Sequence, residues 1–507
     1  MSPLVRCIVV FVLGPAALAL AGAAPPQEKN AEGAPSGPSQ RAQAPLDAAV
    51  NSGRVASERR VAARVDSERA RRRVHALVAL GPRMGGTPSG DAAAEYVAAQ
   101  LRECGLDVRV VDDPEKDAWQ PTKWKLVARR RDSGEELALE RAWPWTHSAP
   151  GRGKLELSLE GRADAAWLTA KVARGPSTTP LVIVDGATNI DGEYPVVSSL
   201  RAGATQACFG VSKPEGARLR EWLAAGAKVE VEYELEAVAR RARPKTVLAR
   251  LRGANSAADG AWSAEHFLFC AHGDSDSGGP GADDNASGVA TLLEIAQAWS
   301  ASIKAREFPP PAREVRFAIW GSEIFSTREH LSARIPAEGA CLGVLNYDQA
   351  GFGSGADQLN LEPDDLPANR ALIECALGVL REHAPAPSDK PADFPARWAT
   401  NRSLGGTDSY VFSGSEYFKS NARPALTLFS SAWGSPAEHK RTPGMPGESW
   451  REREKVSVDY DAYYHSSGDT PANTTDKEPW NIAWCARIGL LSAARFVATA
   501  PAEERTK

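Results

Sequence analysis

Five side chains with metal-binding or proton-transfer chemistry follow apolar, strand-like runs or lie in the loops beyond them: His272, Asp284, Glu323, Asp348 and His465. Imidazole and carboxylate groups without a thiolate suit a divalent cation, with zinc as the first choice. Zinc with an open coordination position activates water, and a nearby carboxylate can take and return its proton. A single histidine after a strand is more often structural, so the prediction of a hydrolytic metal centre rests on the five occurring together.

An alternation of strands and helices could bring these side chains to one place. In such α/β folds a mostly parallel, mixed sheet is covered by helices on both faces, and ligands collect at the carboxyl ends of its strands. Apolar runs predict strands at 106–112, 246–253, 265–271, 314–321, 342–348 and 425–429. Helical periodicity predicts helices at 69–81, 90–105, 287–302, 367–383 and 479–500.

The sequence pattern changes between residues 114 and 243, where the alternation of strands and helices is interrupted. Short strand-like pieces, 154–161, 180–186, 207–211 and 228–236, are separated by glycine, proline and charged turns, with one helical stretch at 216–227. Such short, turn-bounded runs are typical of a β-rich unit. We predict that residues 114–243 form an inserted, mostly β module.

The first 69 residues predict two further segments. Arg6 precedes the apolar run 7–20, and an Ala-Gly-Ala sequence follows, which indicates a cleaved signal peptide at 1–23. A membrane anchor is the alternative, but the run is shorter than the ~20 residues that a span needs. We therefore expect a secreted or periplasmic protein with no membrane contact after leader removal. Residues 24–69, rich in Ala, Pro, Gln, Ser and Arg, predict a flexible lead-in.

Composition excludes several classes of protein. The chain has 507 residues, and 60 Lys and Arg against 64 Asp and Glu give a net charge of −4, without the basic field of a nucleic-acid binder. The seven cysteines include no C-x-x-C pair, so neither a cysteine zinc site nor a thioredoxin-like motif is indicated. No pattern in the sequence indicates the oligomeric state.

Several segments together resemble the zinc exopeptidase family that includes secreted leucyl aminopeptidases, glutamate carboxypeptidases, glutaminyl cyclases and the transferrin receptor. The segments are 80–108, 266–296, 343–351, 405–412 and 463–470. The resemblance covers 70–113 and 244–500 and implies a zinc peptidase domain with a phosphorylase/hydrolase-like core. PLVIVDG and the later LRAGATQACFGV are similar to a protease-associated module, which implies that 114–243 is a protease-associated-like domain.

The resemblance also implies a role for each metal-binding side chain. His272 and Asp348 would bind one zinc, Asp284 would bridge two ions, and His465 would bind the other. Asp274 would orient the imidazole of His272 from behind.

Four further side chains have implied or alternative roles. Asp283 competes with Asp284 for the bridging position, and we prefer Asp284 because it directly precedes the Asn of D-N-x-S-G, a bond that is often cis in relatives. Tyr464 would hydrogen-bond the oxyanion or serve only as a packing residue. Asp469 would brace the loop of the second histidine, and Asp408 would line the substrate pocket.

One position departs from the family pattern of two consecutive glutamates, a general base and then a metal ligand. Here the pair is Glu323-Ile324, so Glu323 aligns with the base and isoleucine stands at the ligand position. Because isoleucine cannot bind a metal, four outcomes remain open. They are a single zinc, a second ion completed by another ligand such as Glu329, Glu323 itself as a ligand, or no useful metal.

These observations predict a secreted zinc-dependent exopeptidase that hydrolyses terminal peptide bonds, with one or two ions and an altered second metal site. We favour an aminopeptidase acting on small peptides. The alternatives are a catalytically impaired binding protein on the same scaffold and a single-zinc aminoacyl cyclase. The end of the peptide that is cleaved, the side-chain preference and the role of the inserted module stay open.

Overall fold

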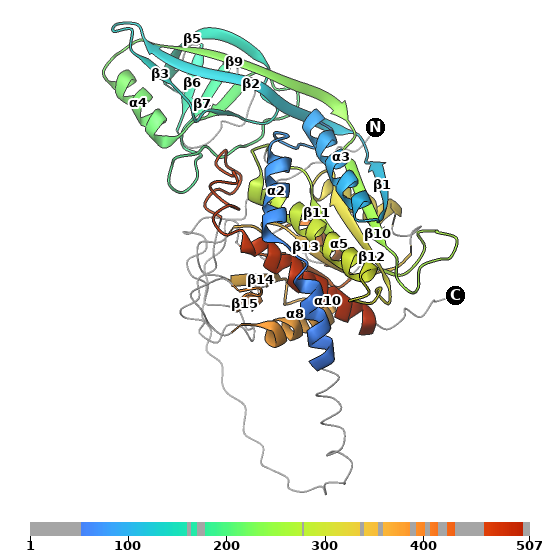
Figure 1. Cartoon of the computed structure of the whole chain (residues 1–507). Coiled ribbons are helices and arrows are strands. Elements are labelled where there is room, and N and C mark those ends of the chain that lie inside the picture. The colour runs from blue at the N-terminus through green and yellow to red at the C-terminus, as the bar shows by residue number, and fades with distance from the viewer. Residues whose placement is uncertain are drawn as a thin grey trace, which may run out of the picture. The chain divides into compact units, whose positions relative to one another are not determined.

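The computed structural model describes residues 52–159, 164–169, 178–275, 278–334, 339–352, 358–385, 392–400, 406–413, 423–430 and 461–499 (Figure 1). The chain divides into two units, Met1–Ser52 and Gly53–Lys507, and the description below concerns the second. The predicted signal peptide and the first part of the predicted lead-in lie outside the described residues.

An eight-stranded mixed sheet forms the centre of the main domain, with strand order β1-β10-β12-β11-β13-β16-β14-β15. Strand β11 runs parallel to both β12 and β13, and β13 runs parallel to β16. The pairs β1–β10, β10–β12 and β14–β16 are antiparallel. The strands are β1 Asp107–Asp112, β10 Lys245–Leu251, β11 His266–His272, β12 Glu314–Trp320, β13 Cys341–Tyr347, β14 Gln358–Glu362, β15 Arg397–Thr400 and β16 Ala425–Phe429. The predicted fold class is confirmed.

Helices cover both faces of this sheet because successive strand side chains point to opposite sides. In β11, Phe267 and Phe269 join one buried cluster, whereas Leu268 and Cys270 join another. Helices α2, α3, α5, α8 and α10 contribute to the first cluster, and α9 contributes Phe412 to the second. The helices are α2 Ser67–Val78, α3 Pro88–Glu103, α5 Gly288–Lys304, α6 Phe325–Glu329, α8 Arg370–His383, α9 Asp408–Ser413 and α10 Trp480–Thr499, with short turns η1 Ala282–Ser287, η2 His330–Arg334 and η3 Pro367–Asn369.

Helix α10 is the one described helix that is long and apolar enough to cross a membrane. However, 78% of its most apolar stretch is buried inside the protein. It packs against α5 and α8, and its apolar side chains belong to the main core. Its composition therefore agrees with that of a core helix.

The predicted flexible lead-in at 24–69 is wrong for its last part. Residues 53–62 are helical, and Val61 and Val65 are buried in the main core. The nearby Glu58 carboxylate is buried and pairs with an arginine of α10 at 2.7 Å. A few apolar positions and one buried ion pair thus order a segment whose average composition is that of a flexible chain.

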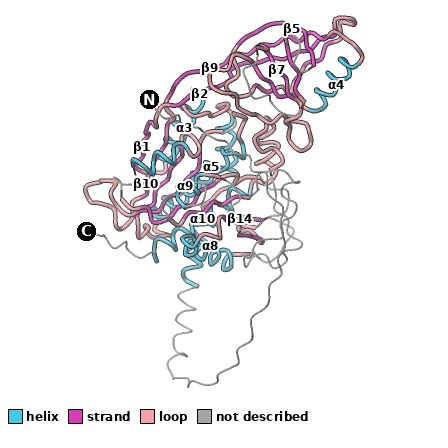
Figure 2. The backbone as a smooth tube through the Cα atoms, turned by 180° about the vertical axis from the view of Figure 1, so that it is seen from behind, coloured by secondary structure: helices cyan, strands magenta, loops and turns pink. Residues whose placement is uncertain are grey.

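A second eight-stranded sheet lies between Lys116 and Ala242, with order β3-β2-β9-β5-β6-β7-β8-β4 and its own buried core (Figure 2). The long strands β2 and β9 pair along their whole length, from Lys116 opposite Ala242 to Arg130 opposite Val229. They continue directly into the neighbouring β1 and β10 of the main sheet. The strands are β2 Lys116–Arg130, β3 Glu136–Ala138, β4 Trp143–Pro144, β5 Gly151–Leu159, β6 Ala165–Leu168, β7 Leu181–Val184, β8 Ala207–Gly210 and β9 Val229–Ala242, with helix α4 Lys213–Ala224.

Candidate metal centre

Three of the predicted ligands meet at one edge of the main sheet. His272 ends β11, Asp348 follows the neighbouring parallel strand β13, and Asp284 lies in η1. Nε2 of His272 lies 3.3 Å from Oδ1 of Asp284 and 3.5 Å from Oδ1 of Asp348. One candidate ligand atom from each residue lies within 4.8 Å of the other two. Parallel neighbours bring their carboxyl ends to the same edge, which is why the strand pattern predicted this meeting point.

His465 reaches the same carboxylate from the opposite side. Its Nε2 lies 3.1 Å from Oδ2 of Asp284, so this aspartate stands between two imidazoles, as a bridging ligand must. Asp283, the sequence alternative, instead accepts a hydrogen bond of 2.8 Å from the backbone N–H of Gly351. The peptide bond after Asp284 is cis, as the resemblance implies.

The donor atoms of this cluster fit a divalent cation. Nε2 of His272 and Oδ1 of Asp348 are buried and make no well-aligned hydrogen bond within the described part of the chain. Burial opposes a charged imidazole, yet the carboxylates of Glu323, Asp274, Asp284 and Asp348 hold the pKa of His272 well above its ordinary value, so this cluster favours a positive charge. Buried polar atoms rarely lack partners, and converging imidazole and carboxylate donors suit zinc.

Asp274 contacts His272 at Nδ1, the ring nitrogen that does not face Asp284 and Asp348. The Nδ1 atom of His272 lies 3.2 Å from Oδ1 of Asp274 and 3.0 Å from the carbonyl oxygen of the same residue. The same Oδ1 accepts a hydrogen bond of 3.1 Å from the backbone N–H of Glu323. One buried carboxylate therefore positions both the imidazole predicted to bind the metal and the segment that carries the predicted base.

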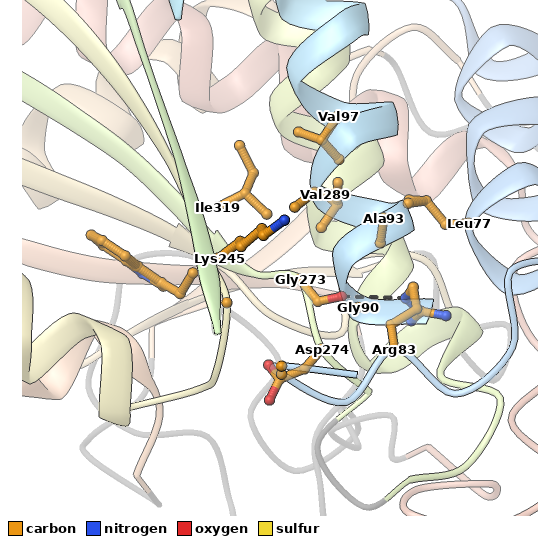
Figure 3. A pocket seen from close by; sticks show the side chains of 15 residues that line it. Leu77, Arg83, Gly90, Ala93, Val97, Lys245, Gly273, Asp274, Val289 and Ile319 are labelled. Carbon is orange, nitrogen blue, oxygen red and sulfur yellow. Dashed lines mark hydrogen bonds between the residues drawn. The ribbon is translucent and has the colours of Figure 1, made fainter. Parts of the chain in front are cut away.

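Arg83 fixes the two loops that carry these ligands, a role that the sequence analysis missed. Its guanidinium is buried and donates hydrogen bonds to the carbonyl oxygens of Pro280 at 2.9 Å and Gly281 at 2.6 Å. A third, of 3.3 Å, goes to the carbonyl oxygen of Gly273 (Figure 3). Burial lowers the pKa of Arg83 to about 10, and the surrounding aspartates oppose this shift. The adjacent cavity, of about 20 Å³, is too small for a peptide, so the arginine is a structural support. Its place in the segment 80–108 was the available signal.

Asp469 supports the bridging residue itself. Its Oδ1 accepts a hydrogen bond of 2.8 Å from the backbone N–H of Asp283, and its Oδ2 accepts one of 3.0 Å from that of Asp284. Burial raises the pKa of Asp469 to about 6, although these two N–H groups favour its charged form. The carboxylate thus holds the η1 segment, and its predicted bracing of the His465 loop stays a prediction.

The loop after β12 places Ile324 next to the predicted base. The backbone N–H of Ile324 donates a hydrogen bond of 2.8 Å to Oδ1 of Asp408, which also accepts one from the Thr327 hydroxyl. Asp408 is fully buried, and its predicted contact with substrate stays a prediction. Glu329, the suggested replacement ligand, ends α6, and among the described residues it forms no ion pair or hydrogen bond with His272, Asp284, Asp348 or His465.

Two other residues lie beside the cluster: Thr407, which was not predicted, and Tyr464, which was. The Thr407 hydroxyl donates a hydrogen bond of 2.7 Å to Oδ2 of Asp348, and its position within 405–412 was the only signal. The Tyr464 ring stacks on the imidazole of His465, with centroids 3.7 Å apart and an interplanar angle of 23°. This stacking supports a packing role for the tyrosine ring and leaves the predicted role of its hydroxyl untested.

The inserted module contacts the loop of the second histidine. The backbone N–H of Val197 donates a hydrogen bond of 2.8 Å to the carbonyl oxygen of His465, and that of Ser467 donates one of 3.0 Å to Pro195. Val196 and Ser466 form an isolated antiparallel bridge. Since these segments lie far apart in sequence, no local pattern could predict their pairing.

A cavity of about 390 Å³ opens between this module and the metal-binding cluster. The main domain contributes Asp274 and His465, while the module contributes charged and aromatic side chains. The full lining is Met84, Gly85, Lys116, Asp117, Ala118, Trp119, Thr146, His147, Val197, Ser198, Ser199, Asp274 and His465. Its size suits a small organic ligand such as a short peptide.

Comparison with known proteins adds a family and a fold. Residues 246–488 match the model of peptidase family M28. The chain is similar to the structure of a peptidase M28 precursor from Shewanella amazonensis, at 16% identity over 89% of this chain and 98% of that one, with a TM-score of 0.57. It is also similar to BSAP, a zinc aminopeptidase from Bacillus subtilis, at 17% identity over 87% and 97%, with a TM-score of 0.52. At such identities the likeness between structures concerns the fold.

Proposed function

Because residues 246–488 form a metallopeptidase domain of family M28, we propose that the chain is a zinc-dependent exopeptidase, in the first place an aminopeptidase. The family match confirms the family and the enzyme class that the sequence predicted. One observation carries the proposal further. The donor atoms of His272 and Asp348 converge beside Asp284 and make no well-aligned hydrogen bond among the described residues, and Glu323 is close enough for its charge to act on the histidine.

His272, Asp284 and Asp348 would hold the zinc ion. When bound, zinc supplies a Lewis acid that polarises the peptide carbonyl and lowers the pKa of water. Glu323 takes a proton from the attacking water as its oxygen bonds to the carbonyl carbon, and returns it to the amine nitrogen as the C–N bond breaks. The Tyr464 hydroxyl donates a hydrogen bond to the oxyanion of the tetrahedral intermediate.

The second metal position is altered in this proposal. Asp284 and His465 offer two donors there, but Ile324 supplies none, and in the described part of the chain Glu329 forms no ion pair or hydrogen bond with either. Two donors bind a zinc ion more weakly than the three or four usual in protein sites. We therefore expect one tightly held ion and weak occupancy of the second position.

The location and domain boundaries belong to the same proposal. The apolar run at 7–20 supports export to a secreted or periplasmic location, and mass measurement of the mature N-terminus would test cleavage after residue 23. The separate sheet between Lys116 and Ala242 supports a protease-associated-like insertion at 114–243 in a peptidase domain of 70–113 and 244–500. Short peptides are the proposed substrates.

Metal analysis combined with a Glu323→Ala variant tests the function. We expect the purified protein to retain one zinc ion and release amino acids from dipeptides and aminoacyl substrates, and the variant to retain zinc but lose turnover. Full activity of the variant would remove Glu323 from its assigned role. Absence of both zinc and hydrolysis in the wild type would favour a binding protein, the alternative that Ile324 raises. Cyclisation of an N-terminal glutamine peptide without hydrolysis would favour a single-zinc cyclase.

A further inference from the structure

The inserted module supplies a positively charged side chain to the cavity beside the metal-binding cluster. Lys116 is the first residue of β2 and lines the cavity of about 390 Å³ together with His465 and Asp274. Its Nζ donates a hydrogen bond of 2.6 Å to Oγ of Ser322, the residue before the predicted base. The ammonium group therefore lies at the junction between the module and the proposed reaction centre.

No carboxylate of the described residues lies within ion-pair distance of this ammonium. The two acidic residues next to it in sequence pair with another cation: Glu115 and Asp117 lie 3.6 and 3.3 Å from Arg241, although Asp117 also lines the cavity. The Lys116 Nζ instead lies 5.3 Å from the centre of the Phe325 ring. Among the described residues, the half-buried ammonium contacts the Ser322 hydroxyl and the Phe325 ring, so it can still bind an anion from the cavity.

The other basic group of the module in this cavity, His147, does not provide the charge. Burial and the neighbouring Lys116 lower the pKa of His147, although Asp117 opposes the shift. The imidazole is therefore neutral near pH 7, and it can only donate or accept a hydrogen bond. The positive charge on the module's side of the cavity comes from Lys116.

We propose that Lys116 binds the α-carboxylate of the residue that follows the scissile bond, so that the preferred substrates are dipeptides with a free carboxyl end. This inference rests on the proposed function. Ser322 ties the ammonium to the segment of Glu323, and one residue of extended chain spans ~3.5 Å, so a carboxylate one residue beyond the attacked carbonyl is within reach. Longer peptides would place an uncharged amide there and lose the contact.

The test compares leucyl-leucine with leucyl-leucine amide, which differ only in the terminal charge. We expect the wild type to favour the free acid by about tenfold or more in kcat/KM, mainly through KM, because a hydrogen-bonded charge pair is lost with the amide. Lys116→Met should abolish the preference, and Lys116→Arg should keep part of it. Lys123→Met is the matched control, since this exposed lysine of the same strand pairs with Glu234 outside the cavity.

Equal use of acid and amide by the wild type, or an equal loss of both in Lys116→Met, would overturn the inference. Leucyl-glutamate amide distinguishes a side-chain carboxylate as the ligand, and its use in preference to the free acid would also overturn it. Calorimetry with analogues of both dipeptides, whose peptide bond is reduced to CH2–NH, measures binding without turnover. Acid-selective binding without hydrolysis would keep this site and reject the peptidase proposal, while equal binding of both analogues would reject the site.

Discussion

The backbone N–H of Ile324 donates a hydrogen bond of 2.8 Å to the buried carboxylate of Asp408. This contact fixes the main chain at the position where the family resemblance implies a second metal ligand. The isoleucine has a positive φ of 56°, and its side chain is half-buried. Because the backbone there is already held, a different side chain can be placed at this position with little rearrangement.

We predict that Ile324→Glu increases the zinc content from one ion towards two. The new carboxylate would join Asp284 and His465 as a third donor at the second position. Metal analysis after dialysis against a low zinc concentration measures the change. The control is Ile324→Gln, because glutamine has nearly the same shape as glutamate but no charge. This variant should leave the zinc content unchanged. A wild-type protein that already holds two ions after this dialysis would contradict the prediction.

Tyr464→Phe should separate the two possible roles of the tyrosine. Phenylalanine keeps the ring that stacks on His465 but lacks the hydroxyl. If the hydroxyl stabilises the oxyanion, kcat should fall by about 10²-fold with little change in KM or zinc affinity. Steady-state kinetics on a dipeptide measures the effect. An unchanged kcat would assign the residue to packing alone.

Arg83→Met should destabilise the fold and weaken zinc binding together. The change leaves the carbonyl groups of Pro280 and Gly281 without their buried donor, at a cost of about 1–3 kcal/mol for each unsatisfied group. Urea unfolding with and without zinc measures both effects. The exposed Arg102→Met serves as a control and should change stability by less than ~0.5 kcal/mol. Normal zinc affinity in a destabilised Arg83→Met protein would show that the arginine does not position the ligand loops.

Glu362 should make stability fall as pH rises. Burial raises its pKa from the ordinary 4.5 to about 8, opposed by a hydrogen bond of 2.9 Å from the Tyr410 hydroxyl. The folded state then holds a proton that the unfolded state has lost between about pH 4.5 and 8, so this contribution is complete below that range and lost above it.

Through Glu362, the free energy of unfolding should fall by at most about 1.4 kcal/mol per pH unit. Urea unfolding at pH 5, 7 and 9 measures it. The Glu362→Gln protein, which keeps an acceptor for Tyr410, should lack this part of the pH dependence. Identical pH profiles for the two proteins would mean that Glu362 is ionised in the fold.

The sequence could predict those parts of the fold that depend on local periodicity. The buried strands β11, β12 and β16 are rich in apolar residues, and their order along the chain indicated a mixed sheet with ligands at its carboxyl edge. The short strands β14 and β15 were missed because each has five residues or fewer and no distinct pattern. The long strand β2 was missed because it is stabilised by pairing with β9, more than 90 residues later.

The candidate site also has parts that the sequence could predict and parts that depend on contacts between distant segments. His272 and Asp348 end or follow strands, so their meeting follows from topology. The supports of the site come from elsewhere in the chain: Arg83 precedes α3, and Lys116 belongs to the inserted module. Single lysines and arginines resemble solvent-exposed residues in a sequence, and only the tertiary structure shows which carbonyl, hydroxyl or cavity they face.

The short backbone pairing between Val196–Val197 and His465–Ser466 has a consequence for engineering. Excision of the module, by joining residue 113 to residue 244, would remove the partner strand of the segment that carries the second imidazole. A shortened form of this chain that keeps residues 195–197 would therefore preserve the backbone contacts of the His465 loop that excision removes.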